Sequence, residues 1–87
     1  MIKRDYTIKS VNGLTSRLSS ALVSMANRFK CDSQLIYLDE SADLKSIMNV
    51  MSLVIRFNEP FSILTTGDDE LTAINSIESL MKEIHLI

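Results

Sequence analysis

The 87-residue sequence has no tryptophan and only one cysteine, one proline, two glycines and one histidine. The lone cysteine, Cys31, cannot form a disulfide within the chain, so we expect a fold that does not depend on an oxidising compartment. Few glycines and prolines interrupt a composition that is 46% apolar, which is typical of a folded globular chain. A chain of this length has one modest core, and we expect a single domain over residues 1–87.

The charge and hydropathy of the chain exclude further classes of protein. The net charge of -2 does not favour nucleic acid as a direct partner, and five aromatic residues are too few for a base-stacking platform. The chain opens on Ile2-Lys3-Arg4-Asp5 and not on an apolar run. We therefore expect no signal peptide, no membrane contact and a cytoplasmic location. We also predict no metal ion and no cofactor.

Hydrophobic periodicity divides the chain into short elements. Alternation predicts a strand over Ile2–Lys9, and helical spacing predicts a helix over Ser16–Phe29. The later elements, in order, are strands over Asp32–Leu38 and Ser41–Leu44, a short helix over Ser46–Val54, a strand over Pro60–Thr66, and a last helix that buries Leu71, Ile74, Ile77, Met81 and Ile84. The order β-α-β-β-α-β-α predicts an α+β domain with its helices on one face of a mostly antiparallel sheet. We expect Phe29 and Ile77 to be buried against that sheet.

Two hydroxyl residues precede the first two helices. Thr15 and Ser46 are suited to cap them, because a side-chain oxygen can accept a hydrogen bond from an early helix amide. The helix after Ser46 is too apolar for its length to bury every side chain. We therefore expect some of Ile47, Met48 and Met51 to be exposed, and exposed apolar clusters usually mark a partner surface.

Two segments resemble motifs of the HPr family, the phosphocarriers of bacterial sugar phosphotransferase systems. Residues 12–18, Asn-Gly-Leu-Thr-Ser-Arg-Leu, are similar to the family's active-site motif, usually Gly-Leu-His-Ala-Arg-Pro. Residues 44–53 are similar to the regulatory serine motif of Gram-positive members, with Asn49 in place of a glycine. The resemblance covers essentially the whole chain. It implies an HPr-like open-faced β-sandwich, in which a four-stranded antiparallel sheet carries three helices.

The resemblance places Thr15 where the family keeps its active-site histidine. A phosphohistidine passes its phosphoryl group on readily, whereas a threonine ester does not, so we predict no catalytic residue and no enzyme activity. The sole histidine, His85, lies far outside the motif, and we expect it to be solvated or at a helix end. Arg17 is retained and is either an anion-binding residue or a solvated charge. Leu18 replaces the family's proline, and we expect it to add an exposed apolar group.

The serine motif carries the expected function. The resemblance implies that HPr kinase/phosphorylase phosphorylates Ser46, beside Lys45. It also implies that the modified serine and the apolar residues Ile47, Met48 and Met51 bind a LacI-type catabolite repressor. Asn49 adds bulk at that surface and could alter affinity for the partner. The chain is thus similar to the Crh-like branch of the family, which lacks the catalytic histidine and keeps the serine.

Two other functions stay open. A diverged or mobile-element copy could act as a decoy that occupies enzyme I, the kinase or the repressor without being modified. A true phosphocarrier is the other alternative, and Thr15 argues directly against it. On the leading interpretation, enzyme I remains a partner that transfers no phosphate to the chain.

Overall fold

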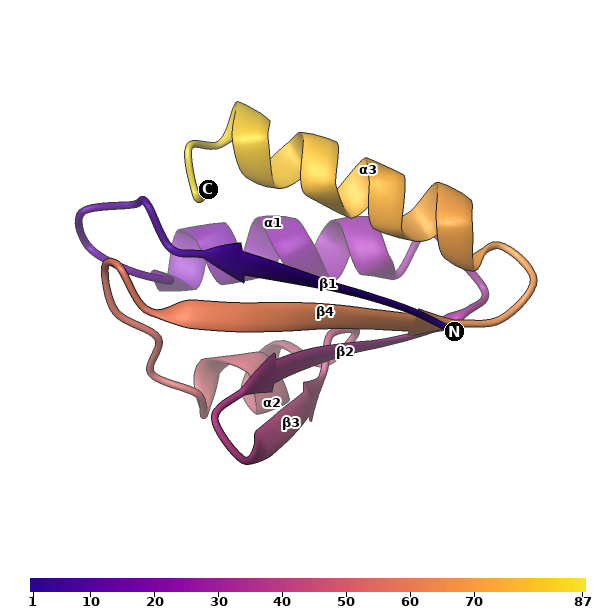
Figure 1. Cartoon of the computed structure of the whole chain (residues 1–87), viewed down its shortest axis with the longest axis horizontal. Coiled ribbons are helices and arrows are strands. Elements are labelled where there is room, and N and C mark those ends of the chain that lie inside the picture. Colours follow the sequence, from indigo (N-terminus) through magenta and orange to yellow (C-terminus); the bar gives the residue numbers. More distant parts are fainter.

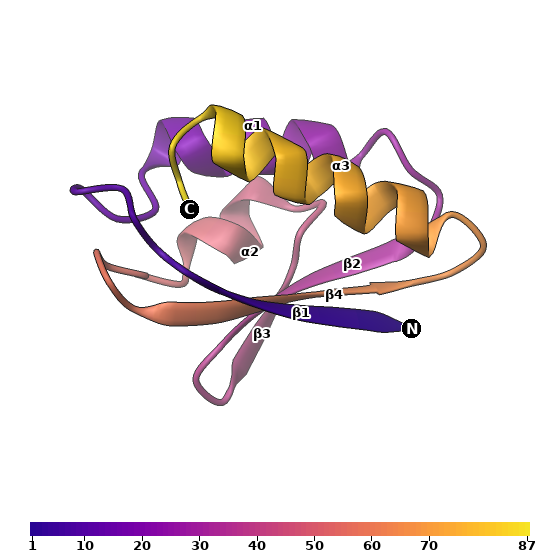
Figure 2. The same ribbon diagram turned by 45° about the horizontal axis from the view of Figure 1, so that its top comes forward.

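The computed structural model describes every residue from Met1 to Ile87, and its elements follow the predicted order (Figure 1). The elements are β1 (Ile2–Thr7), α1 (Ser16–Ala26), β2 (Asp32–Tyr37), β3 (Glu40–Asp43), α2 (Ile47–Met51), β4 (Pro60–Thr66) and α3 (Glu70–Glu83). Turned by 45°, the molecule shows all three helices on one side of the sheet (Figure 2). The predicted α+β open-faced sandwich is therefore confirmed.

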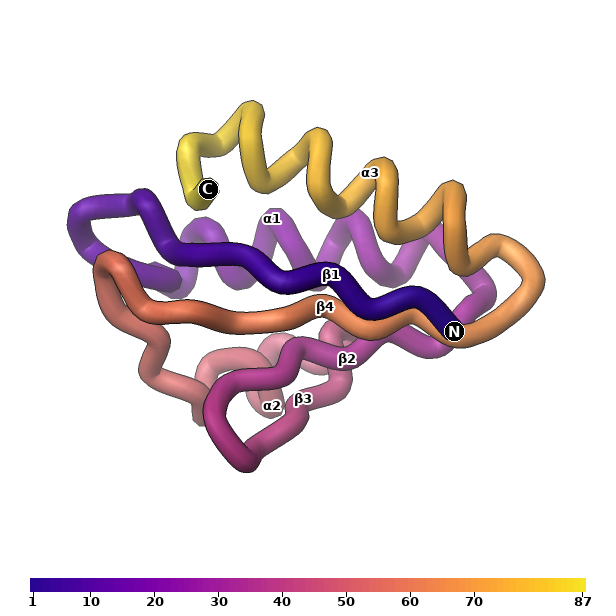
Figure 3. Tube along the Cα trace, in the orientation of Figure 1, coloured from indigo at the N-terminus to yellow at the C-terminus, as the bar shows by residue number.

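The four strands form one antiparallel sheet in the order β1-β4-β2-β3, so β1 and β3 are its edges. The tube view shows β1 and β4 running side by side along most of their length (Figure 3). Phe61, Ile63 and Thr65 alternate along β4, point toward the helices and are buried. Tyr6 of β1 lies opposite Phe61, and their ring centroids are 5.6 Å apart.

The core lies between this face of the sheet and the helices. Its largest fully buried side chains include Leu22 of α1, Leu35 of β2, Ile63 of β4, and Ile74 and Ile77 of α3. The prediction that Ile77 is buried is confirmed. None of the helices is both long enough and apolar enough to cross a membrane.

Helix α1 ends earlier than the apolar stripe predicted. Asn27 is its C-cap, and the Asn27 side-chain amide donates to the carbonyl of Val23, which closes the last turn. Phe29 therefore lies in the connection to β2, half-buried and outside the core. The prediction that Phe29 packs against the sheet is wrong, because the chain has already left the helix to enter β2.

Two smaller differences concern the other helices. Leu71 was predicted to be buried and is 55% exposed, because it lies in the first turn of α3, where that helix extends past the end of α1 (Figure 1). Helix α2 is shorter than the predicted helix over residues 46–54, since it ends at Met51. Leu53, just after it, turns back into the core.

Candidate functional site

Thr15 caps α1 as predicted. Its Oγ1 accepts a hydrogen bond from the amide of Leu18 at 3.3 Å. Just before it, the amide of Leu14 donates to the carbonyl oxygen of Ile55 at 2.9 Å. At Gly13, where φ is +74°, a Cβ would lie 2.6 Å from that oxygen, so only glycine fits. The start of α1 is thus held against the segment that follows α2.

Arg17 and Leu18 follow Thr15 and differ in environment. Arg17 is exposed, and its guanidinium makes no ion pair or hydrogen bond within the chain. Leu18 was expected to be an exposed apolar group but is 6% exposed and belongs to the core. The expectation is wrong because residue 18 lies on the same helix face as Leu22, one turn further on.

Ser46 caps α2, as predicted. Its Oγ accepts from the amide of Asn49 at 3.3 Å, and its carbonyl accepts from the amide of Val50 at 3.0 Å. The hydroxyl donates to no acceptor in the chain, so its proton remains available to an outside base.

A small apolar surface adjoins Ser46. Ile47, Met48 and Met51 line a shallow pocket together with Ser52, and we call the first three the methionine patch. Met48 is 81% exposed and Met51 47% exposed, whereas Val50 of the same helix is fully buried. The prediction that α2 exposes part of its apolar surface is confirmed.

Asn49 is exposed beside this patch. Its φ angle is not in the left-handed region, so the backbone at this position does not require glycine. Its carbonyl oxygen accepts a hydrogen bond from the Ser52 hydroxyl at 2.6 Å. The asparagine therefore adds side-chain bulk at the surface without disturbing the helix.

The two predicted sites lie at opposite ends of α1. Thr15 and Arg17 are at its start, whereas the residue before Ser46 is joined to its end. The Asn27 side-chain amide donates to the carbonyl of Lys45 at 3.1 Å, and the Lys45 ammonium donates to the carbonyl of Phe29 at 2.7 Å. Eleven helical residues separate the two ends, a rise of about 16 Å. The structure does not bring Thr15 and Ser46 into one pocket.

Asn27 was not singled out from the sequence. The only local signal is that asparagine is a common residue where helices end. Its contact with Lys45 joins residues 18 positions apart, and no local pattern encodes such a contact.

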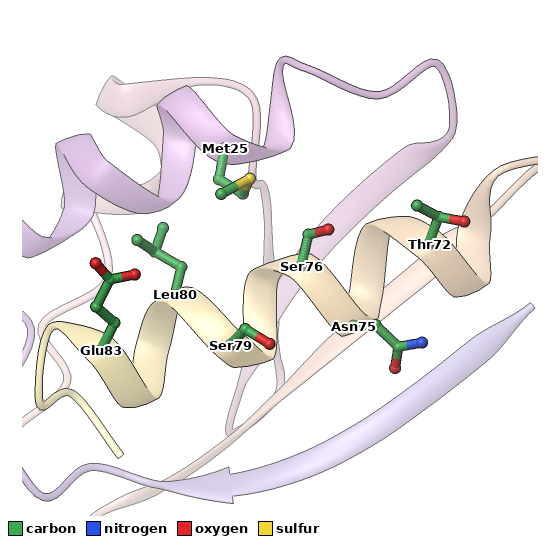
Figure 4. Close-up of a pocket in the computed structure, with 7 residues that line it drawn as sticks. All are labelled: Met25, Thr72, Asn75, Ser76, Ser79, Leu80 and Glu83. Atoms are coloured by element: carbon green, nitrogen blue, oxygen red, sulfur yellow. The ribbon is translucent and has the colours of Figure 1, made fainter.

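The remaining reactive or ligating groups form no second site. No group of three or more His, Cys, Asp or Glu side chains is placed to hold a metal ion. His85 is exposed just after α3. Burial raises the pKa of the Cys31 thiol, which disfavours the nucleophilic thiolate. A groove between α1 and α3 is lined by Met25 and by mostly polar residues of α3 (Figure 4), and none of the predicted site residues lies in it.

Comparison with known proteins identifies the family of the chain. A family model described as the PTS HPr component phosphorylation site matches residues 2–83. The fold is that of the small phosphocarrier domains of phosphotransferase systems, whose members are carriers and not themselves enzymes. The chain belongs to the HPr family.

Solved structures of the family cover nearly the whole chain. The histidine-containing phosphocarrier protein of Mycoplasma is 32% identical, with 99% of this chain and 98% of that chain covered and a TM-score of 0.96. HPr of Bacillus anthracis is 29% identical, with 90% of this chain and 93% of that chain covered and a TM-score of 0.83. The catabolite repression protein Crh of Bacillus subtilis is 28% identical, with 95% of each chain covered and a TM-score of 0.75. Similarity thus extends both to phosphocarriers and to a protein of catabolite repression.

Proposed function

We propose that this chain is a cytoplasmic regulatory member of the HPr family that does not relay phosphate through histidine. Support comes from Thr15, which replaces the histidine of the active-site motif, and from the position of the only histidine, His85, outside that motif. A carrier needs a nitrogen nucleophile, because a phosphoramidate returns its phosphoryl group easily and a threonine ester does not. Enzyme I then has no acceptor on this chain, although it can still dock.

The proposed switch is phosphorylation of Ser46 by HPr kinase/phosphorylase. The Ser46 Oγ attacks the γ-phosphorus of ATP, and its proton passes to a base of the kinase. The bond between the γ-phosphorus and the oxygen that bridges it to the β-phosphorus breaks, and ADP leaves. The observation that carries this proposal is the placement of Ser46, whose hydroxyl proton is uncommitted, directly beside the exposed methionine patch. The serine motif of residues 44–53 supports the choice of kinase.

The phosphate would change the charge and the hydrogen-bonding groups of the surface only around Ser46. It adds about -1.5 to -2 charge and three strong acceptor oxygens, which arginine or lysine side chains of a partner can bind. The methionine patch supplies apolar contact area next to this charge, and methionine adapts its shape to a partner. A LacI-type catabolite repressor is the proposed partner, and Arg17, exposed at the other end of α1, is a separate cation that the partner can contact.

Treatment with purified HPr kinase and ATP, followed by mass mapping, tests the proposal. We expect one phosphate on Ser46, none on the Ser46→Ala variant, and normal modification of Ser52→Ala, which removes a neighbouring hydroxyl. If the kinase modifies a standard HPr and leaves this chain unmodified, the switch is wrong. A decoy that docks without being modified would then be the better account.

A matched pair of variants tests the methionine patch. Met48→Ala should weaken binding of the phosphorylated chain to the repressor with little change in unfolding free energy, because Met48 is already 81% exposed. Val50→Ala lies in the same helix and should cost about 1.5–3 kcal/mol of stability, because Val50 is fully buried. Titration of binding and urea unfolding distinguish the two effects.

A further inference from the structure

The segment before Ser46 is fastened to the end of α1 by a pair of hydrogen bonds that run in opposite directions. Asn27 donates to the Lys45 carbonyl, and the Lys45 ammonium donates to the Phe29 carbonyl. Each segment thus gives one hydrogen bond and receives one. We call this pair of contacts the α1 clasp.

The α1 clasp acts on the peptide unit that leads into Ser46. The carbonyl of Lys45 and the amide of Ser46 belong to one planar group, so they cannot turn independently. Asn27 holds the carbonyl side at 3.1 Å, and the Ser46 amide donates to the carbonyl of Asp43 at 3.0 Å. The plane is therefore held on both sides.

This plane fixes the backbone of Ser46, and further hydrogen bonds fix its carbonyl and its side chain. Beyond the plane, the Ser46 carbonyl is held by the amide of Val50 and its Oγ by the amide of Asn49. Every backbone group of Ser46 is thus engaged, and only the hydroxyl proton is free. We propose that Asn27 and Lys45 are positioning residues, which orient the Ser46 hydroxyl for phosphoryl transfer. This inference rests on the proposed function of Ser46.

The position of Lys45 fits this role better than a role as a free cation at the partner surface. Its side chain is half-buried, and its ammonium lies 2.7 Å from a carbonyl just after the C-terminal end of α1. Carbonyl oxygens carry negative partial charge at a helix C-terminus, which favours a cation there. A hydrogen bond from an ionised donor is also stronger than a neutral one.

Steady-state phosphorylation of the full chain by HPr kinase and ATP tests the proposal. Asn27→Ala and Lys45→Met each remove one arm of the α1 clasp, and Lys45→Met keeps the apolar stem. We expect kcat to fall about 10-fold or more while KM for the protein changes little, because misplacement of a reacting group reduces the rate of the chemical step. Lys45→Arg should restore kcat, since its guanidinium can donate to the same carbonyl.

Lys30→Met is the matched control. It removes the same charge from the same end of α1, but the Lys30 side chain makes no hydrogen bond, so kcat should stay at the wild-type value. Thermal unfolding followed by circular dichroism verifies that each variant is folded. The positioning role would be overturned if kcat were unchanged in both clasp variants. It would also be overturned if KM for the protein rose while kcat stayed the same.

Amide hydrogen exchange separates this inference from the proposed function. Exchange at the Ser46 amide should be faster in Asn27→Ala and Lys45→Met than in the wild type or Lys30→Met. If the kinase does not modify the wild-type chain, the proposed function fails, and exchange alone decides whether the α1 clasp holds Ser46. Equal exchange rates in all four proteins would overturn the clasp.

Discussion

The carboxylate of Asp69 accepts a hydrogen bond from the backbone amide of Cys31 at 2.9 Å, across 38 residues of sequence. Its other oxygen accepts from the amide of Lys30, also at 2.9 Å. Asp69 occupies the N-cap position of α3, yet its side chain makes no capping hydrogen bond there. It instead joins the start of α3 to the connection between α1 and β2.

Replacement of Asp69 should therefore destabilise the fold in a pH-dependent way. The hydrogen bond from the Lys30 amide, more than any other contact, holds the pKa of Asp69 below its ordinary value. A lowered pKa in the folded state means that the stabilisation is present above the unfolded pKa of about 3.9 and is lost as the pH falls through the folded value. Asp69→Asn should lower the free energy of unfolding at neutral pH, and the difference from wild type should shrink in acid.

Urea unfolding at neutral and acidic pH measures this difference. Asp68→Asn is the control, because it makes the same charge change at the next residue, which is exposed and makes no side-chain hydrogen bond. If the two variants behaved alike, the stabilisation would come from charge near α3 and not from the two amide contacts.

Tyr6 should make the fold sensitive to alkaline pH. Burial, aided by the hydrogen bond that its hydroxyl donates to Glu78 at 2.9 Å, raises the pKa of Tyr6 to about 12. A raised pKa means that the stabilisation is complete below the unfolded pKa of about 10 and is lost as the pH rises toward the folded value. Tyr6→Phe keeps the ring against Phe61 and removes the titrating group.

We expect wild type to be more stable than Tyr6→Phe at neutral pH, with the difference shrinking above about pH 10. Urea unfolding across this range measures it. A difference that did not change with pH would show that the hydroxyl contributes through packing alone.

Truncation of Ile77 should lower the free energy of unfolding much more than truncation of Phe29. Ile77→Ala removes a fully buried side chain of α3 and should cost about 2–5 kcal/mol of unfolding free energy. Phe29→Ala should cost less, although it deletes more atoms, because Phe29 is half-buried and lies outside the core. Urea unfolding ranks the two variants, and a larger loss for Phe29→Ala would contradict the packing described above.

Thr15 offers a test of the phosphate relay. The wild-type chain should take no phosphoryl group from enzyme I and phosphoenolpyruvate, because it has no nucleophilic nitrogen at the active-site motif. Thr15→His should restore acceptance to some extent, with an acid-labile phosphate as the product. Thr15→Ala should not accept phosphate and should lose about 0.5–2 kcal/mol of stability with the cap.

The outcome that contradicts this prediction is an acid-labile phosphate on the wild-type chain. Mass spectrometry before and after acid treatment detects it. His85 would then be the first residue to replace, because it is the only histidine.

The sequence by itself determined the order of the elements and the N-terminal caps of α1 and α2. These features are local, because alternation, helical spacing and a hydroxyl that reaches an amide three residues ahead all depend on neighbours in the chain. Strand β4 was placed at its observed bounds, and the exposure of Met48 and Met51 followed from the length of α2 and its apolar content. Membership of the HPr family was also carried by contiguous motifs.

Only the tertiary structure decided where α1 ends, what Leu18 faces and which polar groups join distant segments. The apolar stripe continued to Phe29, but the helix ended at Ala26, because the chain had to turn toward β2. Asp69 meets Cys31 and Asn27 meets Lys45 across 38 and 18 residues. A polar side chain carries no local sign of the backbone group it will meet, since that group is brought near only when the helices pack on the sheet.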